Sequence, residues 1–105
     1  MRDYTYVEDI VNGIILGLTN ISKFKYEIFN LGSNKNIMLK NMVKICELIV
    51  KTNSILEYSN IPKGDVNYTF SDNSKSKELL GYEPKISFEK GLGKTFIWLK
   101  HYYKI

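Results

Sequence analysis

Cysteine is almost missing from this chain of 105 residues, because Cys46 is the only one. No internal disulfide can form, and no group of thiolates is available to bind a metal ion. We therefore expect a reducing compartment and no metal site. Cys46 falls on the apolar face of an expected helix with no histidine near it in sequence, so a core side chain is favoured over a nucleophile.

Long hydrophobic runs are missing as well. The longest apolar stretch, residues 14–18, contains Gly17 and is far too short for a membrane span. The first residues also lack the basic, apolar and small-residue succession of a secretion signal. We expect a cytoplasmic protein that does not interact with a membrane.

No segment concentrates charge of one sign. Fifteen basic and eleven acidic residues give a net charge of +4, but the lysines are scattered rather than gathered in runs. This distribution does not predict a nucleic-acid partner. The hydrophobic content of 44% and aromatic content of 13% instead predict a folded chain with a core, and its length predicts a single domain.

Two stretches have the apolar spacing of amphipathic helices. Residues 7–18 and residues 39–50 each place apolar side chains three or four positions apart, which puts them on one face. Gly13 and Gly17 would each weaken the first helix by roughly 1 kcal/mol relative to Ala. We therefore expect close backbone packing at both glycines.

Two other stretches read as short strands. Residues 26–33 (YEIFNLGS) are aromatic and branched, and they end in Gly32, which is typical of a buried strand leaving a sheet through a tight turn. Residues 54–59 (SILEYS) are a second candidate. The order of strand, loop and helix predicts an α/β unit.

The last third contains an expected loop and two expected helices. Pro62 and Gly64 indicate a loop, and a short helix should follow between the capping residues Asp72 and Gly81. Ser87 is the expected cap of the final helix. That helix gathers aromatic side chains on one face, which predicts a partner surface.

Three stretches resemble, in the same order, the carboxy-terminal third of extended short-chain dehydrogenase/reductases (SDRs) that act on nucleotide sugars. Within that family the chain is most similar to UDP-glucuronate and UDP-galactose 4-epimerases. The stretches are RDYTYVEDIVNGI, YEIFNLGS and GDVNYTFSDNSKSKELLGYEPKISFEKGL. The resemblance implies the C-terminal portion of an extended Rossmann-type fold, of the α/β (α+β fragment) class. About four helices and two or three short strands are expected, with residues 1–105 as one nucleotide-sugar-binding region.

The same resemblance implies that the N-terminal NAD-binding domain is absent. The family's glycine-rich phosphate turn and Tyr-x-x-x-Lys catalytic pair lie upstream of the matched region. This sequence has no Gly-x-x-Gly-x-x-Gly stretch and no Tyr followed four residues later by Lys. We therefore expect no catalytic residue and no bound NAD in this chain, although the parent enzymes use NAD; activity of the chain alone is not expected.

The resemblance also assigns candidate UDP contacts. Arg2 matches an arginine that contacts the diphosphate, and Asp65 matches an acidic residue that accepts hydrogen bonds from ribose hydroxyls. The family places Arg or Gln where this chain has Pro62, so Lys63 would have to reach the ligand instead. Without the resemblance, Asp65 also fits a turn-forming residue and Arg2 a solvated charge.

For other residues of these motifs, a structural role is the favoured interpretation. Asp3 is expected to fix a loop rather than to touch ligand. Asp72, Ser74 and Lys75 match an Asp-x-Ser-Lys region, in which capping is favoured over ligand contact. The strand at residues 26–33 normally needs neighbouring strands and would be exposed without them.

Two functions remain open. The first is the substrate-binding segment of an NAD-dependent nucleotide-sugar 4-epimerase, favoured over a dehydratase or reductase. It would hold the UDP moiety while a missing domain or a homologous subunit performs hydride transfer. The alternative is an inactive stand-alone interaction module that pairs with another SDR protein. A truncated product, a split enzyme and a module have the same sequence signature.

Overall fold

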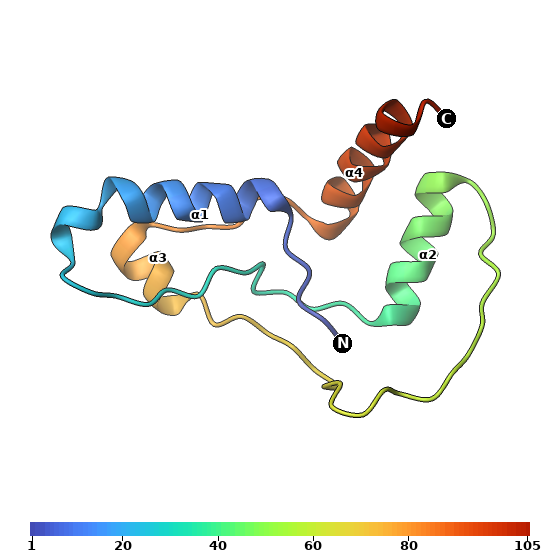
Figure 1. Ribbon diagram of the computed structural model, residues 1–105, viewed down its shortest axis with the longest axis horizontal. Helices are drawn as coiled ribbons and strands as arrows, with labels where there is room; N and C mark the ends of the chain where they lie inside the picture. Colours follow the sequence, from blue (N-terminus) through green and yellow to red (C-terminus); the bar gives the residue numbers. More distant parts are fainter.

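The computed structural model describes all residues 1–105 and contains four α-helices and no β-strand. The molecule is flat and elongated, 50 × 36 × 18 Å (Figure 1). Helix α1 contacts α3, and α4 contacts α2. The elements are α1 (Val7–Thr19), the 3₁₀ turn η1 (Ile21–Lys23), α2 (Leu39–Val50), α3 (Ser74–Leu80) and α4 (Phe88–Tyr103).

The helix ends follow local capping chemistry. Ser87 caps α4 as predicted, because its Oγ accepts a hydrogen bond from the Lys90 backbone N–H at 3.2 Å. Gly81 ends α3 in the left-handed region at φ +68°, also as predicted. The N-cap of α3 is Asn73, one residue later than predicted, and the Asp72 carboxylate accepts the Ser74 N–H at 2.9 Å. Hydrogen bonds from the Ser74 side chain and backbone lower the pKa of Asp72.

The two expected strands are not formed, so the prediction of two or three short strands was wrong. Residues 26–33 and 54–59 have no ladder partner, because no backbone–backbone hydrogen bond joins them to another segment of the chain. Tyr26 and Ile28 are 82% and 63% exposed rather than buried. The exposure expected for this segment without neighbouring strands is observed.

Close packing around two glycines joins the elements. A Cβ at Gly13 of α1 would lie 2.6 Å from Leu31 Cδ1, and one at Gly91 of α4 would lie 2.9 Å from the Tyr6 ring. The prediction of close packing is confirmed for Gly13. It was wrong for Gly17, since nothing lies within 4 Å of a Cβ there.

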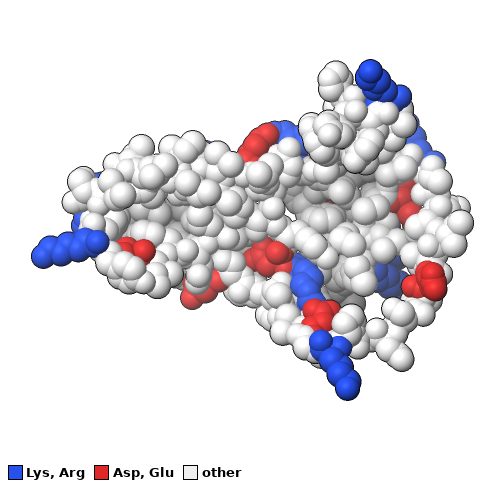
Figure 2. Space-filling model, viewed as in Figure 1, with Lys and Arg blue, Asp and Glu red and all other residues white.

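Much of the apolar surface has no neighbour within the chain. The predicted apolar stripe of α1 is 47–62% exposed at five positions, and Figure 2 shows few charged atoms over this helix. These positions are Val7, Val11, Ile14, Ile15 and Leu18. Cys46 is only half-buried on α2. None of the helices is long and apolar enough to span a membrane.

Candidate functional site

The first three residues lie between two other segments of the chain. On one side, the Arg2 and Ile37 backbones exchange two hydrogen bonds, at 3.0 and 2.9 Å. On the other side, the Thr69 N–H donates to the Met1 carbonyl at 3.2 Å, and the Thr69 hydroxyl accepts from the Asp3 N–H at 2.9 Å. The backbone around Arg2 is therefore held on both sides.

Asp3 ties this segment to two loops. Its Oδ1 accepts hydrogen bonds from the Ser33 backbone at 3.0 Å and from the Ser33 and Thr5 hydroxyls. Its Oδ2 accepts from the Ser71 N–H at 3.0 Å. Burial alone would raise the pKa of Asp3, but the hydrogen bonds from Ser33 and Ser71 outweigh it and hold that pKa below its ordinary value. The expectation that Asp3 fixes a loop is confirmed.

Gly32 is the point where the loops meet the start of α3. Its carbonyl accepts from the buried Tyr82 hydroxyl at 3.0 Å and from Asn73 Nδ2 at 2.8 Å. A Cβ at this glycine would lie 2.2 Å from Ser71 Cβ, so no larger residue fits. Burial, with smaller contributions from acidic side chains, raises the pKa of the Tyr82 phenol.

Asp9 has a role that the sequence reading missed. Its carboxylate is 3% exposed and accepts hydrogen bonds from the backbone N–H groups of Lys85 and Ile86, at 2.9 and 3.0 Å. It therefore holds the segment that leads into α4 against the first turn of α1. The available signal was its spacing of four residues from Gly13, which places both on the packed face of α1.

Arg2 and Asp65, both assigned to UDP by resemblance, are in direct contact. Arg2 Nη2 donates to Asp65 Oδ1 at 2.7 Å, and Nη1 donates to the Met1 carbonyl at 3.2 Å. The two side chains are 28% and 48% exposed. Arg2 is therefore an ion-paired residue rather than an isolated solvated charge.

A tight turn presents Asp65. The Asp65 N–H donates to the Pro62 carbonyl at 3.2 Å, and Gly64 has the positive φ of +87° that this turn requires. Lys63 lies at the corner of the turn and is exposed, with no ion pair. The Asp65 backbone closes the turn while its carboxylate binds Arg2, so the turn and the arginine contact coexist.

The arrangement offers donors for an oxyanion. A guanidinium has five N–H donors, of which Arg2 uses two, and Lys63 adds a second positive charge in the turn beside Asp65. A planar fork of this kind suits phosphate oxygens. The partly exposed carboxylate of Asp65 remains able to accept hydrogen bonds from hydroxyl groups.

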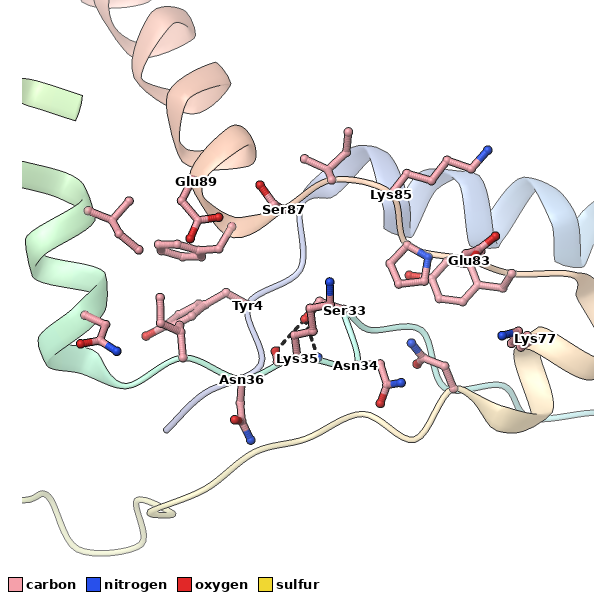
Figure 3. A pocket seen from close by; sticks show the side chains of 18 of the residues that line it. Tyr4, Ser33, Asn34, Lys35, Asn36, Lys77, Glu83, Lys85, Ser87 and Glu89 are labelled. Carbon is pink, nitrogen blue, oxygen red and sulfur yellow. Dashed lines mark hydrogen bonds between the residues drawn. The ribbon is translucent and has the colours of Figure 1, made fainter. Parts of the chain in front are cut away.

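A second hollow of the molecule is a separate feature. A cavity of about 1050 Å³ opens between α2, the start of α4 and the loop at residues 33–37 (Figure 3). Figure 3 shows Tyr4, Asn36 and Ser87 around it. Arg2, Lys63 and Asp65 do not line this cavity. The predicted contacts therefore lie apart from this cavity.

No protein-family model matches the chain. The UDP-glucuronate 4-epimerase of Thermodesulfobacterium geofontis is 43% identical over 100 residues, which are 94% of this chain and 30% of the relative. The crystal structure of UDP-glucose 4-epimerase from Thermotoga maritima with UDP-glucose is also similar. It has a TM-score of 0.83 and 31% identity, over 96% of this chain and 32% of that chain.

A crystal structure of a mutant UDP-glucuronic acid 4-epimerase from Bacillus cereus is similar too. It was solved with UDP-4-deoxy-4-fluoro-glucuronic acid and NAD; its TM-score is 0.84 and its identity 25%, over 96% of this chain and 32% of that chain. The chain aligns with the C-terminal part of UDP-glucuronate 4-epimerase-like extended SDR enzymes. The resemblance read from the three motifs is confirmed.

The chain spans about 30% of the length of these epimerases. Its own residues do not fit a dinucleotide: the structure has no strand that turns through glycines into a helix N-terminus, the unit that binds pyrophosphate in such folds. No step of a reaction is therefore assigned to NAD on these residues. What they offer is a partly exposed guanidinium, that of Arg2, with N–H groups that have no partner in the chain.

Proposed function

We propose that this chain is the substrate-binding segment of an NAD-dependent UDP-sugar 4-epimerase and that it holds the UDP moiety. The observation that carries the proposal is the contact between Arg2 and Asp65, two residues 63 positions apart, at 2.7 Å. Both belong to the motifs that resemble UDP-sugar epimerases, and the match to the Thermodesulfobacterium geofontis relative covers 94% of this chain. The relatives are named as epimerases, which supports an epimerase over a dehydratase or reductase.

Each candidate residue has a separate role. The free N–H groups of Arg2 donate to the diphosphate, and Lys63 adds a mobile positive charge at the same group. Asp65 accepts hydrogen bonds from ribose hydroxyls. When NAD is bound by the rest of the enzyme, it supplies hydride transfer; the residues of this chain fix the UDP end and so orient the sugar.

The exposed apolar surface of this chain supports a second part of the proposal, that another domain or subunit packs against it. The stripe on α1 and the unpaired segment 26–33 leave large side chains in water. We propose that residues 1–105 form one region and that an NAD-binding domain, or a homologous subunit, covers these surfaces. Covering them would also supply the missing backbone partners for residues 26–33.

A second function is favoured by the aromatic end of α4. Trp98, Tyr102 and Tyr103 are more than half exposed, and the rings of neighbouring pairs lie 5.2 and 5.0 Å apart. Such a cluster suits a protein partner, and an inactive module that pairs with another SDR protein would need no UDP contact. Binding of UDP therefore separates the two functions.

The test is a titration of ¹⁵N-labelled chain with UDP and, separately, with NAD, followed by amide NMR shifts. We expect UDP to shift signals near Arg2 and residues 63–66 with millimolar affinity, about 4 kcal/mol. Arg2→Ala should abolish these shifts. Lys23→Ala removes one positive charge from an exposed site outside the proposed contacts, so it is the matched control and should bind normally. Equal or stronger shifts with NAD, or shifts confined to α4, would contradict the proposal.

A further inference from the structure

The backbone contacts of Arg2 do not fix the position of its side chain. Hydrogen bonds to Ile37 and Thr69 hold the backbone on both sides of Arg2, but an arginine side chain retains several rotatable bonds. The contact with Asp65 at 2.7 Å selects one position of the guanidinium. Asp65 itself lies in the turn that its N–H closes on the Pro62 carbonyl, which sets its local backbone conformation.

This ion pair does not contribute much to folding stability. Both side chains are partly exposed, and exposed ion pairs of this kind contribute little, because ordering two side chains costs most of what their attraction gains. The pair also leaves Nε and one N–H on each terminal nitrogen of Arg2 without a partner. A guanidinium that is fixed in place and still offers donors is preorganised for an anion.

We propose that Asp65 is a positioning residue for Arg2: its carboxylate holds the guanidinium where the diphosphate of the nucleotide binds. The proposal rests on the proposed function and deepens it, because it assigns Asp65 an effect on the phosphate end of the ligand. Direct contact with ribose hydroxyls alone would give Asp65 no such effect.

The two roles of Asp65 predict opposite signs for pyrophosphate, which has no ribose. Removing a carboxylate beside the site raises the local positive potential, so charge alone would strengthen the binding of an anion. Loss of positioning would weaken it, because the anion must then order the Arg2 side chain itself. The direction of the change therefore decides between the roles.

The experiment uses the 105-residue chain, in which Arg2 is the only arginine. Labelling arginine Nε with ¹⁵N gives a single side-chain signal, which reports directly on the order of this guanidinium. Amide shifts measure the affinities for pyrophosphate, uridine and UDP at one ionic strength, since screening changes the binding of anions. The variants are Asp65→Asn and the matched control Glu57→Gln, which removes the same charge at an exposed position.

We expect Asp65→Asn to bind pyrophosphate roughly fivefold more weakly than wild type, in keeping with the strength of charge-assisted hydrogen bonds. Its Arg2 Nε signal should show greater mobility. Glu57→Gln should match wild type in both measurements. Amide spectra that retain the wild-type signals of residues 33 and 71 exclude unfolding of the variant as the cause.

Unchanged or stronger pyrophosphate binding in Asp65→Asn would overturn the positioning role. The proposed function would stand in that case if UDP still shifts the signals near Arg2 in wild type. Should UDP and pyrophosphate both fail to shift them, the proposed function fails and the positioning role fails with it, because no anion then binds where Asp65 holds Arg2.

Discussion

Asp3 Oδ2 accepts a hydrogen bond from the backbone N–H of Ser71 at 3.0 Å, across 68 residues of chain. The same carboxylate binds the Ser33 backbone through its other oxygen. One side chain therefore fixes the start of the chain relative to two loops. Both oxygens face backbone donors, so a side chain with only one acceptor oxygen cannot replace it.

Asp3→Asn should destabilise the chain by about 1–3 kcal/mol, because an amide NH₂ would face a backbone N–H and leave that donor unsatisfied. Urea unfolding followed by circular dichroism measures the effect. Glu57→Gln, an exposed change of the same chemistry, should leave the midpoint unchanged. Equal midpoints for Asp3→Asn and wild type would show that the hydrogen bonds of Asp3 do not support the fold.

The lowered pKa of Asp3 predicts a loss of stability in acid. A carboxyl group whose pKa is lower in the folded state stabilises the fold above its unfolded pKa of about 3.9 and loses that contribution as pH falls through its folded pKa. Wild type should therefore lose more free energy of unfolding than Asp3→Asn between about pH 6 and about pH 3. Parallel curves for the two proteins would contradict this. The comparison with Asp3→Asn removes the similar contributions of Glu27, Glu47 and Asp72, whose pKa values are also lowered.

Gly32→Ala should cost about 1–3 kcal/mol or more, because the added methyl group would overlap Ser71 and force the two segments apart. Gly17→Ala is the matched control. Nothing lies within 4 Å of that position, and the change should stabilise α1 by up to about 1 kcal/mol. Denaturant midpoints of the two variants measure both effects. If Gly17→Ala is destabilised instead, another molecule must pack against Gly17 when the chain associates.

The exposed stripe of α1 predicts that the chain associates with itself. Val11 and Ile14 are 47% and 51% exposed, and contiguous apolar surface of this kind is normally covered. Sedimentation should show a mass above that of the monomer that falls on dilution, and Ile14→Lys should reduce it. Leu48→Lys, at a more exposed position on α2, is the control. A monomer with a thermal transition independent of concentration would contradict the prediction.

The isolated 105-residue chain should show no interconversion of UDP-sugars with added NAD. The family's glycine-rich turn for the phosphates of NAD and its Tyr-x-x-x-Lys catalytic pair are not in this sequence. Incubation with UDP-glucuronate or UDP-glucose, followed by chromatography of the products, tests this. Product formation by the pure chain at a rate proportional to its concentration would contradict it.

The sequence predicted the helices well because their signals are local. The apolar spacing at residues 7–18 and 39–50 gave α1 and α2 to within a residue, and Ser87 and Gly81 were correctly placed as caps. Strands depend on partners that are far away in the sequence or outside it. The aromatic and branched pattern of residues 26–33 therefore predicted a strand that this chain alone cannot pair.

For the candidate site too, the sequence predicted single residues but not the contacts between distant segments. Resemblance selected Arg2 and Asp65 separately, but no local pattern indicated that they touch, because the contact joins residues 63 positions apart. The role of Asp9 was missed for a related reason. Acidic residues in a first helical turn usually interact with the helix dipole in water, whereas this one is buried against two backbone N–H groups.

The long connection between α2 and α3 passes around the outside of the molecule (Figure 1), and Ile55 and Tyr58 on it are almost fully exposed. Its far end returns to the start of the chain, where Asp65 and Thr69 bind residues 1–3. The part at residues 55–61, beyond the hydrogen bonds from Ser54 to Glu47, therefore tolerates a change of length, since doubling a flexible loop costs only about 0.6 kcal/mol. Insertions, affinity tags or a fluorescent label can be placed there without moving Arg2 from Asp65.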